Sequence, residues 1–271
     1  MTAVRRFWRL AALAAFLTVA GPASAETPLK RLTLRQDLLG WEAVGRVDLG
    51  SKGYCTGTLI APDTVLTAAH CLFDKGQPVD PSAIRFRAGL VDGDSIAQSR
   101  IARFIAHPGY DAARPTSVES VRHDAGFLIL VEAIPAATAA PFAVGALGPN
   151  ARAISVVSYA KGRDTALSWE RGCSLLGRGS GLMAFDCDVY FGSSGAPVFE
   201  DGGGRPRIVS IISSGHRDEA GATSYGMELA ALLSDLREGL RTGRGVHEAG
   251  AAAPLPRRLG GTASGARFIR P

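Results

Sequence analysis

The amino-acid sequence predicts an all-β protein, and three observations support this prediction. The chain holds 33 Gly and 15 Pro among 271 residues, well above their usual share of about 12%, which favours many turns and short elements over long helices. From about residue 42 onward, short apolar and β-branched runs alternate with turn residues, without helical periodicity. With 46% apolar and 20% charged residues, the chain can also build a full-sized core.

The expected strands fall into two groups that a connecting segment separates. The first group comprises the runs 43–49, 54–60, 64–68, 84–88, 100–105 and 125–131. The last of these runs is continuously apolar, which is typical of a buried strand. Residues 136–149 are rich in Ala, Pro and Gly and indicate a connection between two halves. The second group comprises the runs 154–159, 182–185, 196–199 and 207–212.

A single amphipathic helix is predicted near the end of the chain, from Glu228 to Leu240. Leucines at spacings i, i+3, i+4, i+7 and i+11 form one apolar stripe along it. The stripe comprises Leu229, Leu232, Leu233, Leu236 and Leu240. Gly243 can end the helix, and we expect the stripe to pack on the second half of the molecule.

The first 25 residues have the organisation of a secretory signal peptide. Arg5, Arg6 and Arg9 precede an apolar segment at 10–20, and Ala23-Ser24-Ala25 has the small-x-small pattern of a cleavage site. Cleavage there would leave Glu26 as the first residue. The alternative is an uncleaved anchor, for which about eleven apolar residues are short. We therefore predict an exported protein, secreted or periplasmic.

Positive charge is concentrated at the two ends of the chain. The formal net charge is +5, of which the leader contributes +3 and residues 242–271 contribute +4, so the middle of the chain has a net charge of −2. This distribution gives no support to nucleic-acid binding by the folded body. Residues 242–271 are rich in Gly, Ala, Pro and Arg, which predicts a disordered basic tail. The functional alternative for this tail is a tether to an anionic envelope surface.

Four cysteines predict disulfide bonds in preference to a zinc site. Their number is even, the chain is expected to be exported, and none of them are spaced as C-x-x-C. Three pairings are possible. We favour the pairing of sequence neighbours, Cys55 with Cys71 and Cys173 with Cys187, which closes loops of 16 and 14 residues. We expect no cofactor and no metal.

Three short segments carry candidate catalytic side chains. His70 follows a β-like run and directly precedes Cys71, so a disulfide there would hold it rigidly. Asp124 comes directly before a buried apolar run, where a carboxylate needs a hydrogen-bonding partner. Ser194 lies in a Gly-rich segment in which backbone N–H groups can converge on a ligand. Together they supply the parts of nucleophilic acyl transfer: a hydroxyl, an imidazole that takes its proton, and a carboxylate that fixes the imidazole tautomer.

These segments resemble the signature segments of a known family. Thr67-Ala68-Ala69-His70-Cys71, His123-Asp124-Ala125-Gly126-Phe127-Leu128 and Gly192-Ser193-Ser194-Gly195-Ala196-Pro197 look like those of trypsin-like (chymotrypsin-fold) serine peptidases, in that family's order. The resemblance covers about residues 41–240. The pair Cys55 and Cys71 matches the bridge that the family places around its catalytic histidine.

The resemblance implies a fold of two six-stranded antiparallel β-barrels with a C-terminal α-helix. The peptidase domain would span residues 41–241, with barrels at about 41–135 and 145–227 and the active site in the cleft between them. His70 and Asp124 would belong to the first barrel and Ser194 to the second.

The resemblance also implies a role for each candidate residue. Ser194 would attack the scissile carbonyl, His70 would act as general base and then acid, and Asp124 would orient His70. The N–H groups of Gly192 and Ser194 would form the oxyanion hole, which stabilises the negative charge of the transition state.

The sequence departs from the animal digestive members of the family in two places. The aspartate that precedes their nucleophile, and pairs with a new N-terminal amine after zymogen cleavage, is replaced here by Ser193. No Ile-Val-Gly-Gly segment is present, and the first barrel is approached through Leu39-Gly40-Trp41-Glu42-Ala43-Val44-Gly45. We therefore expect no activation by an N-terminal salt bridge, and we interpret residues 26–40 as an N-terminal extension or a short propeptide. In its Ser193-Ser194-Gly195 sequence the chain is more similar to bacterial secreted trypsin-like and glutamyl endopeptidase-like enzymes.

Substrate preference depends first on Asp188, which lies six residues before Ser194, where trypsin-like enzymes carry the carboxylate of their specificity pocket. That position would favour Arg or Lys before the cleaved bond, but the neighbouring Cys187 bridge leaves a purely structural role equally open. Ser213-Ser214-Gly215 resembles the pocket-edge strand that pairs with substrate. A nearby imidazole, His216, keeps a preference for Glu open.

On this resemblance we expect a monomeric serine endopeptidase that acts on protein or peptide substrates and does not bind nucleic acid. The alternative is a non-catalytic peptide- or protein-binding protein on the same fold, because folds host more than one function. An esterase of the α/β-hydrolase type requires the order Ser, Asp or Glu, His and a G-x-S-x-G elbow. Both requirements fail, since the order is reversed and Ala196 takes the place of the last glycine.

Overall fold

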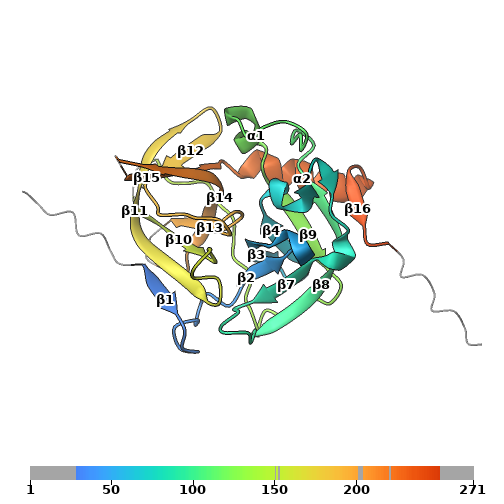
Figure 1. Ribbon diagram of the computed structural model, residues 1–271, viewed down its shortest axis with the longest axis horizontal. Helices are drawn as coiled ribbons and strands as arrows, with labels where there is room; N and C mark the ends of the chain where they lie inside the picture. The colour runs from blue at the N-terminus through green and yellow to red at the C-terminus, as the bar shows by residue number, and fades with distance from the viewer. Residues whose placement is uncertain (1–28, 150, 152, 201–203, 220, 251–271) are drawn as a thin grey trace, which may run out of the picture.

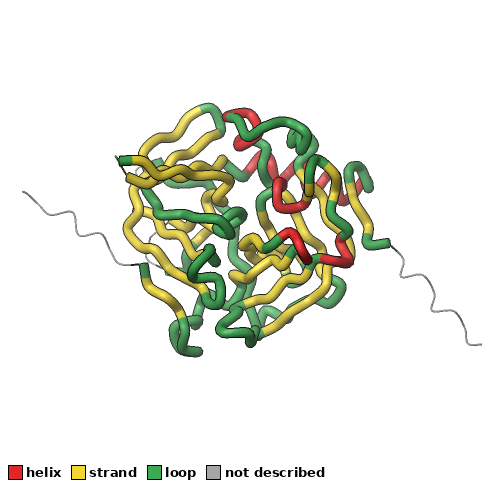
Figure 2. Tube along the Cα trace, in the orientation of Figure 1, coloured by secondary structure: helices red, strands yellow, loops and turns green. Residues whose placement is uncertain are grey.

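The computed structural model consists of two β-barrels that lie side by side (Figure 1). It describes residues 29–149, 151, 153–200, 204–219 and 221–250. Strands dominate this part of the chain and helices are few (Figure 2). The predicted class of two closed six-stranded antiparallel barrels is confirmed. The predicted signal peptide, residues 1–25, lies outside the described residues.

Six antiparallel strands close the first barrel. In sheet order they are β8 (Ala97–Ala106), β7 (Arg85–Ala88), β2 (Val44–Asp48), β3 (Tyr54–Ala61), β4 (Thr64–Thr67) and β9 (Gly126–Leu130), and β9 pairs back with β8. Large side chains such as Leu59, Phe86 and Phe104 fill its interior and are fully buried. The connections contain the small hairpin β5 (Phe73–Asp74) and β6 (Gln77–Pro78), 3-10 turns at Gly50–Lys52, Ala69–Leu72 and Pro81–Ala83, and the short helix α1 (Val118–Arg122).

Six further strands close the second barrel. In sheet order they are β11 (Leu167–Gly179), β10 (Ala153–Ser158), β13 (Pro197–Glu200), β14 (Arg207–Asp218), β15 (Gly221–Met227) and β12 (Leu182–Phe185), and β12 pairs back with β11. Sequence patterns predicted no strand over β11 or β15. Charged residues and glycines in β11, and glycine with small polar residues in β15, obscure the period of two that would reveal them.

Each terminal segment pairs with the barrel that is more distant in sequence (Figure 1). The strand β1 (Lys30–Leu32) precedes the first barrel but pairs with β11 of the second. The strand β16 (Val246–Glu248) follows the second barrel but pairs with β8 of the first. The prediction of disorder from residue 242 is therefore wrong for β16, because the His247 ring packs 4.8 Å from the Phe104 ring. The predicted tail from residue 251 lies outside the described residues.

The predicted C-terminal helix is confirmed as α2 (Ala230–Thr242), and Gly243 ends it in a left-handed conformation with φ +71°. Its expected packing partner is wrong, since α2 lies against β8 of the first barrel. Gly239 allows this contact, because a side chain there would collide with Ile105. Across the same interface Asp235 Oδ2 lies 3.2 Å from His107 Nε2. No helix in the described part of the chain is long and apolar enough to cross a membrane.

Candidate active site

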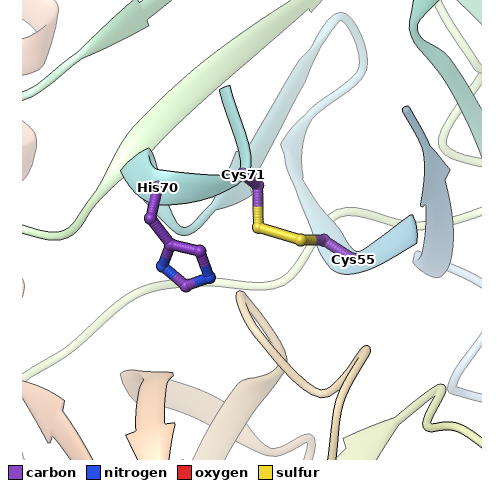
Figure 3. A group of neighbouring side chains, drawn as sticks. All are labelled: Cys55, His70 and Cys71. Carbon is purple, nitrogen blue, oxygen red and sulfur yellow. A yellow bond between two sulfur atoms is a disulfide. The ribbon is translucent and has the colours of Figure 1, made fainter. Parts of the chain in front are cut away.

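His70 lies in the 3-10 turn Ala69–Leu72, directly beyond strand β4. The predicted disulfide between Cys55 and Cys71 is present and ties this turn to β3, with a Cα–Cα distance of 6.4 Å. Figure 3 shows the imidazole and the disulfide leaving the turn in different directions. The Lys52 Nζ atom donates hydrogen bonds to the carbonyl oxygens of His70 and Cys71, at 3.1 and 3.4 Å. The turn that carries the imidazole is thus held both by its side chains and by its backbone.

Asp124 lies between α1 and β9, and its side chain is almost fully buried. Its carboxylate accepts three hydrogen bonds: the His70 backbone N–H at 2.8 Å, the His70 Nδ1 at 2.7 Å and the Ser213 hydroxyl at 2.6 Å. A carboxylate can only accept, so Nδ1 carries the hydrogen and the Nε2 of the neutral ring is left as an acceptor. The structure therefore brings His70 and Asp124 into direct contact, as predicted.

Asp124 also controls the charge state of His70. Burial favours the neutral ring, but the charge of Asp124 and the hydrogen bond to it have the larger combined effect and raise the pKa of His70 above its ordinary value of 6.5. The ring is not sealed off, since 35% of the His70 side chain is exposed. An imidazole in this setting can take a proton and is stabilised as the cation that results.

Ser194 lies in a turn between the two barrels, and both barrels hold its backbone. From the first barrel, the Thr56 backbone N–H donates to the Ser194 carbonyl at 2.9 Å and the Thr56 hydroxyl donates to the Gly192 carbonyl at 2.9 Å. From the second barrel, the Gly195 N–H donates to the carbonyl of Ile212 on β14 at 2.7 Å. Thr56 is a contributor that sequence reasoning missed, and no sequence motif marks it.

The tight conformation of this turn depends on glycine. Gly192 and Gly195 have φ values of +97° and +77°, in the left-handed region that other residues rarely adopt. A methyl group at position 195 would collide with the Thr56 carbonyl oxygen and would lie 2.8 Å from the backbone nitrogen of Ala68. The Ser194 turn therefore packs against the chain two residues before His70. Within the described residues the Ser194 hydroxyl, which is partly exposed, makes no hydrogen bond, either to His70 or to another group.

Two backbone amides of this turn are available to a ligand. The N–H of Ser193 donates to the Tyr190 carbonyl at 2.9 Å, and that of Gly195 is also paired. Within the part of the chain that the structure describes, the N–H groups of Gly192 and Ser194 donate to no protein acceptor. These are the two amides that the sequence predicted for the oxyanion hole.

Ser193 occupies the position at which the animal enzymes carry aspartate, and it is fully buried. Its hydroxyl donates to the Ser158 hydroxyl at 3.3 Å, which in turn accepts a hydrogen bond from Arg163 Nη1 at 3.2 Å. A network of hydroxyls capped by a guanidinium therefore contacts the segment that precedes the nucleophile. The absence of N-terminal activation remains a prediction.

The two charged residues predicted to set specificity, Asp188 and His216, are exposed and paired with neighbouring charges. The Asp188 side chain is 53% exposed, and its carboxylate pairs with Arg217 at 2.5 Å. This carboxylate therefore does not lie at the base of a closed pocket. The His216 side chain is also half exposed and lies 3.5 Å from Asp218. Ser213, predicted to belong to the pocket-edge strand that pairs with substrate, lies in β14 and uses its hydroxyl to bind Asp124.

Two clusters of potential metal ligands occur among the described residues, and disulfide formation changes the chemistry of both. One consists of His70 with Cys55 and Cys71, and the other of Glu170 with Cys173 and Cys187. In each cluster the two cysteines form the predicted disulfide with each other. Neither cluster therefore offers a thiolate to a metal.

The sequence profile described as "Trypsin-like peptidase domain" matches residues 55–205, more than half of the chain. The chain belongs to the trypsin-like peptidase family. The matched region starts at Cys55 and includes His70, Asp124 and Ser194. As a member of this family the protein is a serine endopeptidase, and its substrates are proteins or peptides.

Solved structures support the fold. A Glu endopeptidase in complex with MPD superimposes with a TM-score of 0.60 at 19% identity, covering 73% of this chain and 90% of that one. A thermostable serine protease, AL20, from an extremophilic microorganism gives 0.61 at 20% identity, covering 74% and 98%. Protease Anisep from Arthrobacter nicotinovorans gives 0.57 at 17% identity, covering 72% and 93%. At these identities the likeness concerns the fold of the peptidase alone.

Proposed function

We propose that this peptidase hydrolyses peptide bonds through a triad of Ser194, His70 and Asp124 and an acyl-enzyme intermediate. The observation that carries the proposal is the buried Asp124 carboxylate, which binds His70 through both its backbone and its ring. This arrangement has a catalytic consequence, because it leaves Nε2 as the free acceptor of a side chain that is 35% exposed.

The chemistry begins when the Ser194 hydroxyl oxygen attacks the carbonyl carbon of the substrate and its proton passes to His70 Nε2. The carbonyl oxygen becomes an oxyanion, which the unpaired N–H groups of Gly192 and Ser194 stabilise. The tetrahedral intermediate collapses when protonated His70 gives its proton to the leaving amine, which leaves an ester on Ser194. Water then attacks this ester with His70 as base, and Ser194 is regenerated.

Substrate backbone binds along the free edge of β14. Strand β13 pairs with β14 only from Arg207 to Ile211, and β15 pairs with the other edge as far as Asp218. The edge of Ser213–Gly215 that faces away from β15 therefore has no partner strand among the described residues. An extended peptide can add there as an antiparallel strand, the usual mode of recognition at an open sheet edge.

A cavity of about 340 Å³ lies beside this edge and extends the substrate site. Its walls come from α1 with the residues just before it and from the strands β11, β12, β14 and β15, and they include Val121, Met183, Ser214 and Tyr225. An apolar side chain of the bound peptide, some residues before the cleaved bond, fits such a cavity.

We also propose that the peptidase is exported, after cleavage behind Ala25, and that it acts as a monomer with a basic tail. Two disulfides support this location, since disulfides persist in oxidising compartments. The tail, from residue 251, would supply the contact to an anionic surface.

Digestion of an unfolded protein tests the proposed function. The chain that starts at Glu26 is incubated with reduced casein, and new peptide termini are identified by mass spectrometry. We expect cleavage that falls by at least about 10⁴-fold in Ser194→Ala and is unchanged in Ser82→Ala, a matched substitution at an exposed serine. Binding of the casein without cleavage would instead support the non-catalytic alternative.

A further inference from the structure

The proposed function, on which this inference rests, requires the side chain of the substrate residue before the cleaved bond to enter a defined space. The substrate carbonyl lies at Ser194 and at the free amides, while the substrate backbone follows the edge of Ser213–Gly215. The intervening side chain must therefore insert between β14 and the segment 188–192 that leads to the nucleophile. What fills this space decides which side chains fit.

Val189 borders this space. A methyl group placed on Gly215 would lie only 2.6 Å from the Val189 Cγ2 atom, so Gly215 is already in contact with the valine side chain. Real Cβ atoms essentially never approach so closely. The two walls of the cleft touch at this point, so the Val189 methyl group narrows the space that a long side chain would need.

The position of Val189 is fixed by its neighbours in the chain. The Asp188 N–H donates to both carboxylate oxygens of Glu170, at 2.9 Å each, and the Asp188 carbonyl accepts from Arg163 Nη2 at 3.3 Å. Cys187 is tied to Cys173 on β11. Val189 itself packs against the core of the second barrel, and a β-branched side chain has few alternative rotamers. The valine is therefore not free to swing out of the cleft.

The charged side chains to which the sequence assigned substrate preference are already paired. The Asp188 carboxylate, which would attract Arg or Lys, is half exposed and already paired with Arg217. Arg217, which would attract Glu, is neutralised by the same contact. His216 lies beside Asp218, whose carboxylate would repel a substrate carboxylate.

We propose that Val189, held against Gly215, restricts the residue before the cleaved bond to small side chains such as Ala, Gly and Ser. This restriction disfavours both preferences that the sequence suggested. These are the preference for Arg or Lys, from Asp188, and the preference for Glu, from His216. Val189 is thus a specificity-determining residue of the peptidase.

A peptide series tests this proposal. Fluorogenic substrates that differ only in the residue before the cleaved bond (Ala, Leu, Phe, Arg or Glu) are compared by kcat/KM. We expect the Ala peptide to exceed the others by at least about 10-fold, because even one methylene that does not fit costs that much. In Val189→Ala the Leu and Phe peptides gain about 10-fold relative to the Ala peptide. In Asp188→Ala the order of preference stays the same.

The controls separate this proposal from the proposed function. Val131→Ala, at an exposed valine, leaves the whole series unchanged, and a fluorophosphonate that labels Ser194 reports the catalytic machinery independently of specificity. If the wild-type enzyme is labelled but cleaves after Arg, Glu or Phe best, the restriction by Val189 is overturned and the proposed function stands. If the wild type is neither labelled nor active on any peptide, the proposed function fails and the restriction fails with it.

Discussion

The two barrels contribute to the active site in different ways. The first barrel positions His70 and Asp124 through side chains, with a carboxylate that accepts hydrogen bonds from the backbone and the ring of one histidine. The second barrel positions the Ser194 turn through main-chain conformation, with glycines at φ +97° and +77° and hydrogen bonds between backbone groups. Each barrel also reaches across to the other, since Ser213 binds Asp124 and Thr56 binds the Ser194 turn.

The same catalytic requirement, rigid placement, is therefore met by two physical means. A base must be fixed in one tautomer, which requires a side-chain acceptor at Nδ1. An oxyanion site must present two amides in a fixed orientation, which requires a backbone conformation and therefore glycine. Substitutions in the first barrel should therefore change charge and pH behaviour, whereas those in the second should change geometry.

The largest effect is expected from Asp124→Asn. The carboxamide has a donor NH₂ where Asp124 accepts, so it clashes with the donors of His70 and Ser213 or favours the wrong tautomer of the ring. We expect kcat to fall by about 10⁴-fold. The wild-type rate should fall on acidification through a pKa above 6.5, because protonated His70 cannot act as base and Asp124 raises its pKa. The acid limb of kcat/KM should move to lower pH in the variant, and an unmoved limb would contradict the role of Asp124.

A smaller loss is expected from Gly192→Ala in the second barrel. A methyl group there would overlap the Tyr54 ring and strain a backbone at φ +97°, which misplaces one oxyanion donor. We expect kcat to fall by about 10²- to 10³-fold with the pH profile unchanged. The comparison between the barrels would be wrong if this variant shifted the acid limb of the profile.

The two disulfides allow the barrels to be compared directly. They close loops of similar length, with sequence separations of 16 and 14 residues, so each should contribute about 3 kcal/mol to the free energy of unfolding. Replacing Cys55 and Cys71 by Ser should also lower kcat, since this bridge holds the His70 turn. Replacing Cys173 and Cys187 should lower stability to a similar degree and mainly raise KM. Urea unfolding and steady-state kinetics of both double variants measure these effects, and equal losses of kcat would count against the assignment.

The smallest effect concerns the contact between the first barrel and α2. His107 Nδ1 accepts from the Gly109 N–H at 3.1 Å while Nε2 faces Asp235, and burial lowers the pKa of His107. A lowered pKa means that the neutral ring is favoured in the fold, so stability is full above about pH 6.5 and declines as the pH falls below it. Loss of the Gly109 bond on protonation should cost about 1 kcal/mol. His107→Gln should be less stable at pH 8, with a flatter decline between pH 7 and pH 5, and an equally steep decline would refute this role.

Much of this structure could be predicted from the sequence because its signals are local. His70, Asp124 and Ser194 each lie in a short segment of distinctive composition. The leucine spacing predicts the helix α2. Disulfide pairing also followed from sequence separation, which is a local quantity.

What could not be predicted depends on contacts between distant strands. The packing of Val189 on Gly215 requires the position of β14 relative to the Cys187–Val189 segment, and the pairing of Asp188 with Arg217 requires the same. The hydroxyl of Ser213 reaches Asp124 across the two barrels, and a strand irregularity between Ile212 and Ser214 accompanies that placement. No pattern within one strand encodes such relations, so the sequence predicted neither the bond from Ser213 to Asp124 nor the pairing of Asp188 with Arg217.

The most direct test of the triad is to locate the residue that reacts with an active-site phosphonylating reagent. The peptidase is treated with a fluorophosphonate at pH 8, and the modified peptide is identified by mass spectrometry. We predict one phosphonyl group per chain, attached to Ser194, with labelling lost in His70→Ala although Ser194 is intact. Modification at another serine, or labelling that persists at the wild-type rate without His70, would contradict the proposed triad.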